Sequence, residues 1–366
     1  MLPKWSARLC VEIAAATGWN LARCRCFAGI VIGILASRSV KLGDLAAHIS
    51  GQAQFSSKTR RMQYFFQDFE MAFASVALLL SAMLGQLLGG KWLLALDRTN
   101  WTSRGGEVNL LTLAVCLGDV AIPIFWEDLR RDGNSDTAQR VRLLKRFIAA
   151  FGSERILALT ADREFVGQRW FRWLQLREIP FVLRIKDNFQ VLAGSGWRVP
   201  VSHCFRNLKL GSARSLGLKK VCGVELEVSG LRLPGNEYVI GVSCGVAEGE
   251  ALPLYRKRWR IETLFEKLKT HGFNLEGSRL RGEGKMEKLM AALAVCAAWC
   301  YCVGEWHVRE VAALKIKSHG RPEKSVLRRG LDILRQIFTG CAAEMPRFSR
   351  VALGFLRRIS APPVLN

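Results

Sequence analysis

Two short, largely apolar segments lie far apart in the chain and end in the same dipeptide. Residues 92–96 are followed by Asp97 and Arg98, and residues 156–161 are followed by Asp162 and Arg163. Short apolar runs bounded by polar residues are typical of strands buried inside a sheet. We therefore predict two buried strands, each of which places a carboxylate next to its last apolar residue.

The residues between these two strands predict how the strands are connected. Residues 110–116 and 121–126 have the pattern of further strands, and residues 136–151 predict a helix that ends before Gly152. Three strands joined by short turns, followed by a helical crossover, place the fourth strand parallel to the first when the crossover is right-handed. Asp97 and Asp162 would then be neighbours at one end of the sheet.

A third carboxylate lies in the segment 255–269, which has helical periodicity. At about 100° per residue, four polar residues fall within an arc of about 60°; they are Tyr255, Arg258, Glu262 and Lys269. Apolar side chains occupy the neighbouring face; they are Ile261, Leu264, Phe265 and Leu268. Glu266 lies one turn beyond Glu262 on the polar arc, so it is an alternative to Glu262 as the functional carboxylate.

Three carboxylates surrounded by cations are suited to phosphoryl transfer assisted by metal ions. A pair of Mg²⁺ ions about 3.5–4 Å apart can hold the attacking and the leaving oxygen, and Mg²⁺ prefers oxygen ligands. We expect Asp97 to bridge the two ions, with Asp162 on one ion and Glu262 on the other. The phosphate oxygens of a nucleic-acid strand would be bound by the other polar residues of the helix, which are Tyr255, Arg258 and Lys269.

The overall charge also indicates a polyanionic partner. The chain has 366 residues, a formal net charge of +23 and a hydrophobic fraction of 50%. That charge favours nucleic acid or an anionic membrane surface. The large hydrophobic fraction excludes a disordered basic tail and favours an enzyme that acts on DNA or RNA.

Two apolar segments, residues 73–90 and 289–304, could be read as membrane spans. The second is shorter than the roughly 20 residues that a span needs, and we predict buried core helices for both. The eleven cysteines form no Cys-x-x-Cys pair and show no zinc spacing with the five histidines. Reduced cysteines in the core are the expected state, which predicts a cytoplasmic protein.

The N-terminal part of the chain predicts helices with a basic surface. A helix is expected at residues 42–49, and a second one, capped by Ser57, at residues 58–66. This arrangement is typical of a helix-turn-helix unit that contacts DNA, with Arg60 and Arg61 on phosphates. Further along, residues 181–185, 221–228 and 238–242 predict strands separated by turn residues.

These motifs resemble those of the DDE transposases of bacterial insertion sequences. The segments from Asp97 to Trp101 and from Ala161 to Phe165 are similar to the first two acidic motifs of that family. Tyr255, Arg258, Glu262 and Lys269 have its Tyr-x2-Arg-x3-Glu-x6-Lys spacing, which resembles the cut-and-paste branch that passes through DNA hairpins. Residues 58–66 are similar to the family's N-terminal region, so the resemblance covers most of the chain.

The resemblance implies an α/β protein with a ribonuclease-H-like core, interrupted by a mostly β insertion and flanked by helical terminal regions. In chain order, the implied parts are a helical DNA-binding region (1–72), the first half of the catalytic domain (73–180) and the β insertion (181–246). The second half of the catalytic domain (247–305) and a helical C-terminal region for dimerisation or DNA contact (306–366) follow. Asp97, Asp162 and Glu262 would bind two Mg²⁺ ions, for which Mn²⁺ can substitute. The implied partners are the terminal inverted repeats, target DNA and a second copy of the chain, with no membrane, in the nucleoid of the cytoplasm.

Two other interpretations remain open from the sequence. One is a DNA-binding protein derived from a transposase that occupies element ends without cutting them. It has no physical need for three neighbouring carboxylates. The other is a basic membrane protein, which requires residues 73–90 to be a true span.

Overall fold

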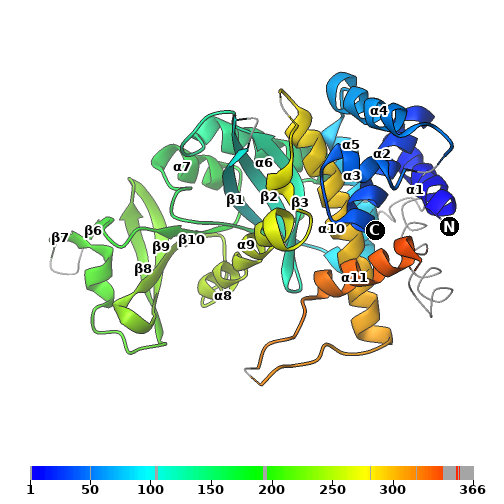
Figure 1. Ribbon diagram of the computed structural model, residues 1–366. Coiled ribbons are helices and arrows are strands. Elements are labelled where there is room, and N and C mark those ends of the chain that lie inside the picture. Colours follow the sequence, from blue (N-terminus) through cyan, green and yellow to red (C-terminus); the bar gives the residue numbers. More distant parts are fainter. Residues whose placement is uncertain are drawn as a thin grey trace.

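A mixed eight-stranded sheet forms the centre of the protein, with the strand order β3-β2-β1-β4-β5-β10-β9-β8 (Figure 1). The computed structural model describes residues 2–49, 51–103, 106–192, 196–280, 282–318 and 320–340, together with residues 352 and 354. The strands of this sheet are β1 (Trp92–Ser103), β2 (Gly106–Leu117), β3 (Val120–Asp128), β4 (Ile156–Ala161), β5 (Phe181–Ile185), β8 (Ala213–Val221), β9 (Val224–Arg232) and β10 (Tyr238–Cys244). A small separate hairpin pairs β6 (Gln190–Leu192) with β7 (Arg198–Pro200).

The helices gather mainly at the two ends of the chain and around the β3 side of the sheet. They are α1 (Leu2–Thr17), α2 (Leu21–Ser37), α3 (Leu42–Ala46), α4 (Phe55–Asp68), α5 (Phe73–Leu84), α6 (Thr137–Phe151), α7 (Gln168–Leu176), α8 (Ala251–Arg256), α9 (Trp259–Glu266), α10 (Lys285–Glu310) and α11 (Val326–Thr339). Both α9 and α10 pack against β3. The fold is therefore mixed α/β with helical N-terminal and C-terminal regions.

The predicted crossover is confirmed. β1 is antiparallel to β2 and parallel to β4, and helix α6 connects β3 to β4. Asp136 caps α6, since its carboxylate accepts from the Gln139 backbone and the Gln139 side chain accepts from the Asp136 backbone. Leu96 pairs with Ala161, so the next residues, Asp97 and Asp162, occupy adjacent positions.

One boundary of β1 differs from the sequence prediction. β1 does not end before Asp97 but continues to Ser103, because the antiparallel partner β2 extends the pairing to Gly106. Asp97 therefore lies inside a strand, at the level where the shorter β4 stops. This fixes the Asp97 backbone by hydrogen bonds to a neighbouring strand, which is a more rigid support than a loop.

The strands predicted within residues 181–246 do not form a sheet of their own. β5 pairs in parallel with β4, and β10 pairs antiparallel with β5, so the central sheet continues without a break into β9 and β8. The apolar residues of β5 are buried and fill the part of the core next to β4. A boundary at residue 181 would separate two strands that are hydrogen-bonded to each other.

Both apolar segments are buried helices, as predicted. The α5 helix buries six of its side chains, and the middle of α10 is almost entirely buried. Among the described residues, α10 alone is long and apolar enough to cross a membrane as one helix, and 89% of its most apolar window lies inside the protein. The consecutive helices α4 and α5 would pass that test only together, and they are bent by 113°.

The N-terminal helices also differ in detail from the prediction. Helix α4 begins at Phe55, so Ser57 lies in its first turn and is not its cap; the capping position is Gln54, whose side chain makes no capping hydrogen bond. Met62, Phe65 and Phe66 anchor the helix on the core.

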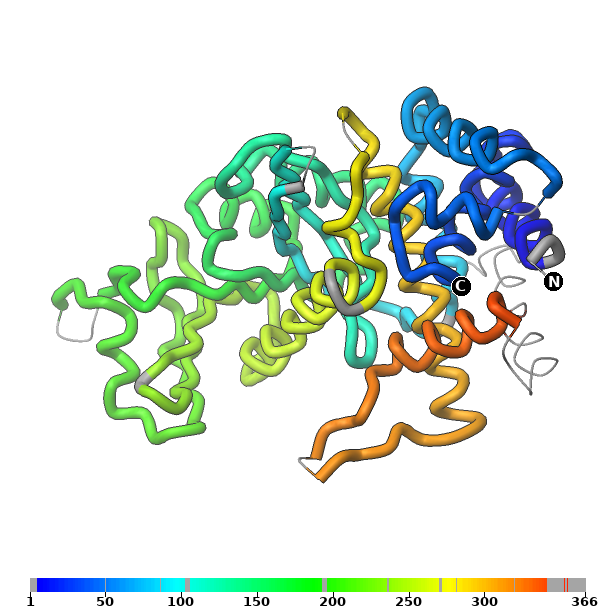
Figure 2. The backbone as a smooth tube through the Cα atoms, viewed as in Figure 1, coloured from blue at the N-terminus to red at the C-terminus, as the bar shows by residue number. Residues whose placement is uncertain are grey.

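Between α10 and α11 the chain projects away from the body of the molecule, as Figure 2 shows.

Candidate active site

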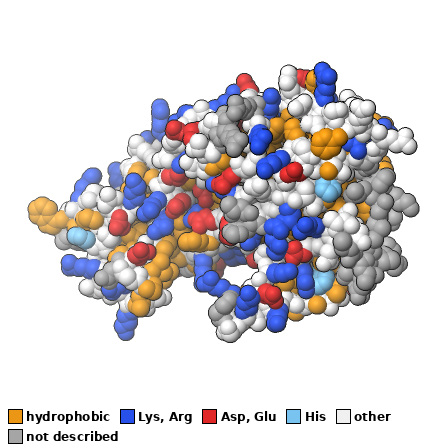
Figure 3. Space-filling model, in the orientation of Figure 1, with side chains coloured by type: hydrophobic (Ala, Val, Ile, Leu, Met, Phe, Trp, Pro, Cys, Tyr) orange, Lys and Arg blue, Asp and Glu red, His pale blue; other side chains and the backbone are white. Residues whose placement is uncertain are grey.

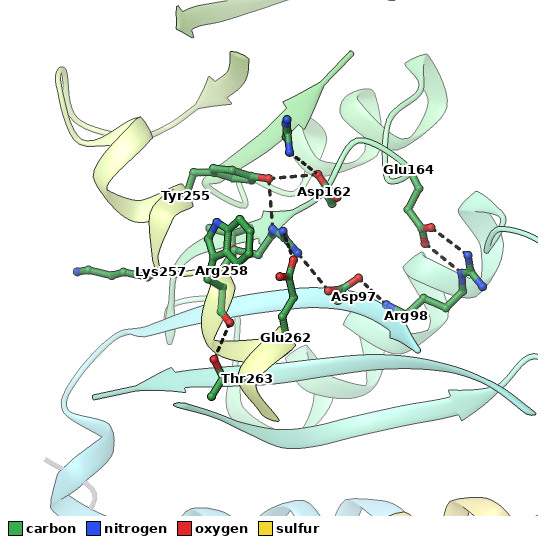
Figure 4. A network of polar contacts seen from close by, with 12 residues as sticks. Asp97, Arg98, Asp162, Glu164, Tyr255, Lys257, Arg258, Glu262 and Thr263 are labelled. Atoms are coloured by element: carbon green, nitrogen blue, oxygen red, sulfur yellow. Dashed lines mark hydrogen bonds and ion pairs between the residues drawn. The ribbon is translucent and has the colours of Figure 1, made fainter. Parts of the chain in front are cut away.

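The structure brings the three predicted carboxylates around one buried guanidinium. Asp97 comes from β1, Asp162 follows β4, and Glu262 lies in the first turn of α9. Figure 4 shows that Asp97 and Glu262 contact Arg258, at the start of α9, and that Asp162 contacts the neighbouring Tyr255. Residues separated by more than 160 positions in the sequence therefore share one polar network.

Arg258 is the centre of this network. Its side chain is 2% exposed, and Nη1 and Nη2 form ion pairs with Asp97 at 3.1 Å and with Glu262 at 2.5 Å. A buried guanidinium needs both charge compensation and hydrogen-bond acceptors, and these two carboxylates supply both. Arg258 therefore holds Asp97 and Glu262 next to each other without any other cation.

Tyr255 joins Asp162 to the same network. Its hydroxyl donates to Asp162 Oδ1 at 3.2 Å and accepts from Arg258 Nε at 3.2 Å. Asp162 Oδ1 also forms an ion pair with Arg184 of β5, at a distance of 3.8 Å. One tyrosine hydroxyl thus separates the second carboxylate from the guanidinium that binds the other two.

Burial changes the protonation of the site. Burial raises the pKa of Asp97 to about 6, although Arg258 opposes the shift. Burial also raises the pKa of Tyr255. Burial alone would lower the pKa of Arg258, but Tyr255 and the nearby carboxylates raise it above its ordinary value, so this guanidinium stays charged.

The segment 255–269 is not the single regular helix that the periodicity predicts. Helix α8 ends at Arg256, α9 begins at Trp259, and residues Lys267–His271 form a π-helical turn. Tyr255 and Glu262 still converge, because the break is short. Lys269 does not join them; its Nζ donates to the Asn100 carbonyl of β1 at 2.9 Å and lies 3.6 Å from Glu276.

The structure distinguishes between the two candidate carboxylates of α9. Glu262 is 40% exposed and contacts Arg258, whereas Glu266 is 54% exposed and lies 3.8 Å from Lys267. Glu262 is thus the α9 carboxylate that belongs to the network.

The sequence reasoning missed two groups near the site. Arg98 forms a bidentate pair with Glu164, with both distances at 3.2 Å, and also donates to Asn109. This pair ties β1 to the turn after β4, just beside Asp97 and Asp162. The matching Asp-Arg dipeptides pointed to these turns, but a pairing across 66 residues has no local pattern.

The donor types suit a divalent cation, but their present arrangement is that of an ion-pair network. Among the described residues, no group of three or more His, Cys, Asp or Glu side chains is close enough to hold one metal ion. The three carboxylates supply the hard oxygens that Mg²⁺ prefers, and burial raises the pKa of Asp97 although Arg258 lies beside it. A cation is chemically suited to this position once Arg258 moves.

Arg60 and Arg61 lie outside this site, on helix α4. Both side chains are exposed. Arg60 Nε donates to the Tyr64 hydroxyl at 3.1 Å. Their predicted role in binding DNA phosphates therefore concerns a different surface from that of Tyr255 and Arg258.

A mixed sheet that presents two aspartates at adjacent strand positions, with a glutamate from a helix beside them, defines a protein with a three-carboxylate centre. The family model described as the transposase DDE domain matches residues 90–299. This match covers more than half of the chain and includes all three carboxylates, so the chain belongs to the family of DDE transposases. A search of curated proteins found no match for this chain.

Proposed function

We propose that this protein is the transposase of an insertion sequence, which cuts DNA at the terminal inverted repeats and joins the freed ends to target DNA by way of hairpin intermediates. The observation that carries the proposal is the convergence of Asp97, Asp162 and Glu262 within the domain that matches the DDE family. The order β3-β2-β1-β4-β5, with a helical crossover, supports a ribonuclease-H-like core.

Catalysis is proposed to use two Mg²⁺ ions, with Mn²⁺ as a substitute, held by Asp97, Asp162 and Glu262. Bound metal would activate the attacking oxygen and offset negative charge on the leaving oxygen. Glu262 is 40% exposed and has room to change its rotamer. The backbone of Asp97 is paired with Thr112 of β2, one residue beyond the last pair between β1 and β4, which keeps that ligand in place.

Arg258 is proposed to have two partners in turn. Without DNA it neutralises Asp97 and Glu262, as the ion pairs support. When a DNA phosphate enters, it would compete with the two carboxylates for the guanidinium, because a phosphate can accept two parallel hydrogen bonds from one arginine. Tyr255 contacts the guanidinium and would donate to a phosphate oxygen, and Lys269, whose Nζ now contacts the Asn100 carbonyl of β1, is proposed to bind a phosphate as well.

The remaining parts of the proposal concern the assembly. The N-terminal residues 1–72 would bind the inverted repeat, with Arg60 and Arg61 on phosphates, and residues 306–366 would contact DNA or a second copy of the chain. The residues between them would form the catalytic domain and its insertion. A homodimer would pair two element ends in the cytoplasm, at the nucleoid.

End-specific cleavage tests the proposed function. Purified protein is incubated with DNA that carries the two ends of its own element, plus Mg²⁺, and the products are separated on a denaturing gel. We expect nicks at the element boundary and covalently closed hairpin ends. Binding of the ends without any cleavage, in Mg²⁺ and in Mn²⁺, would instead identify a transposase-derived DNA-binding protein.

The affinity for metal is expected to rise with pH. The pKa of Asp97 is raised to about 6, so its proton stabilises the folded state, and the contribution of this group to stability falls as pH rises from about 4 to about 6. Metal binding has the opposite dependence, because a ligand must lose its proton first. Calorimetric titration with Mn²⁺ should therefore show about tenfold weaker binding at pH 5 than at pH 7.

The variant Asp97→Asn provides the control for this pH effect. It should bind Mn²⁺ weakly and with a flatter dependence across the same range. Equal affinity of the unmodified protein at both pH values would show that Asp97 is not a ligand.

A further inference from the structure

A groove of about 760 Å³ lies away from the three carboxylates, between the N-terminal helices and the chain that leads into α10. One wall is formed by the start of α3 and by α4, and the other by Arg279, Leu280 and Lys285. Its basic lining residues are Lys41, Arg60, Arg279 and Lys285, and we call it the cationic groove. In Figure 3, Lys and Arg side chains are prominent on the face where these two walls meet.

The charges of the cationic groove favour an anion. Asp44 is the one carboxylate of its described lining, and it already accepts a hydrogen bond from the Ser39 hydroxyl at 2.6 Å. No described carboxylate forms an ion pair with Lys41, Arg279 or Lys285. Four cations facing one occupied carboxylate attract a ligand that carries several negative charges.

One face of helix α4 lines the groove with side chains that can bind nucleic-acid bases and phosphates. The side chains that line it follow the i, i+3, i+4, i+7 spacing of one helix face; they are Arg60, Gln63, Tyr64 and Gln67. Tyr64 is 47% exposed, and the Arg60 guanidinium lies 5.7 Å from the centre of its ring. Aromatic faces stack on bases, amide side chains hydrogen-bond to base edges, and cations bind phosphates.

Hydrogen bonds fix the two walls relative to each other. Lys288 Nζ, at the start of α10, donates to the Phe66 carbonyl of α4 at 2.8 Å. Arg38, which follows α2, donates to the Gly272 carbonyl at 3.3 Å. The second wall follows the π-helical turn after residues 272–278, and Lys269 of that turn donates to the Asn100 carbonyl of β1. The groove is thus built on the same rigid support as the site.

We propose that the cationic groove binds a single DNA strand, with its phosphates on Arg279 and Lys285 and an unpaired base against Tyr64. This inference rests on the proposed function, because an unpaired strand arises when an element end is cut or opened. The volume lies within the range of cavities that hold one small ligand, about 300–1,000 Å³, so the groove can enclose a short part of one strand.

Fluorescence anisotropy with a labelled oligothymidylate of about ten nucleotides, in EDTA, tests the proposal. The double variant Arg279→Glu/Lys285→Glu should weaken binding at least tenfold. It should also make binding less dependent on salt, because a strand that has lost two phosphate contacts releases fewer counterions when it binds. Tyr64→Ala should weaken binding about tenfold by loss of stacking, whereas Tyr64→Phe should bind almost normally. The double variant Arg169→Glu/Arg172→Glu, on the distant helix α7, changes the net charge by the same amount and is the control.

Two results would overturn the proposal. One is unchanged binding of the single strand by the double variant; the other is weaker binding of a matched duplex with the single strand unaffected. Thermal melting of each variant checks that it is folded. Because EDTA removes catalysis from the assay, these outcomes are separate from the proposed function, which fails only in the cleavage assay.

Discussion

Replacing Asp97 with Asn is expected to reduce DNA cleavage by about 1,000-fold while the element end is still bound. The substitution removes one negative charge from the proposed metal ligands and preserves the shape of the side chain. Because burial already raises the pKa of Asp97 to about 6, a neutral side chain is tolerated at this position. Denaturant unfolding of this variant, measured beside cleavage, separates loss of activity from loss of stability, because Asp97 is also an ion-pair partner of the buried Arg258.

Glu266→Gln is the matched control for the carboxylates. It removes one negative charge from the same helix as Glu262, but from a side chain that lies 3.8 Å from Lys267. Cleavage by this variant should remain near the normal rate, whereas Asp162→Asn and Glu262→Gln should behave like Asp97→Asn. Normal cleavage by Asp97→Asn, or its loss in Glu266→Gln, would contradict the assignment.

Replacing Arg258 with Met is expected to produce the largest loss of stability. Removal of one partner from a buried ion pair costs about 3–5 kcal/mol, and we expect the lower end of this range because Glu262 is 40% exposed. The change leaves Asp97 and Glu262 side by side without their shared cation. Denaturant unfolding in EDTA, compared with Arg258→Lys, measures the effect; Lys keeps the charge but lacks the forked donors.

Metal binding gives this variant a second measurement. If Arg258 and metal ions compete for the same carboxylates, Mn²⁺ should raise the melting temperature of Arg258→Met more than that of the unmodified protein. The comparison needs no DNA and no catalytic activity. An equal shift in both proteins would show that Arg258 does not occupy the position of the metal.

The central strands could be predicted because their signals are local. Buried strands, the short turns between them and the Asp136 cap of α6 each depend on a few consecutive residues. The parallel pairing of β1 with β4 then follows from the handedness of the crossover. The proximity of Asp97 and Asp162 is thus a consequence of sequence pattern and topology together.

The details of the site depend on contacts that sequence periodicity does not encode. The break between α8 and α9 and the π-helical turn are set by packing, so Lys269 leaves the face on which an ideal helix would place it. The continuation of the sheet from β5 to β10 likewise depends on pairing between distant segments. The sequence predicted Arg258 as a phosphate-binding residue, and only the tertiary structure shows that it is buried between two carboxylates.

Crystals of the protein with a DNA end and Mn²⁺ would test the central claim most directly, through the anomalous signal of manganese. We expect two manganese peaks, each within about 2.0–2.3 Å of carboxylate oxygens, with Asp97 contacting both ions and Arg258 turned towards a phosphate. Manganese bound elsewhere, with Arg258 still bridging Asp97 and Glu262 beside the DNA, would contradict it.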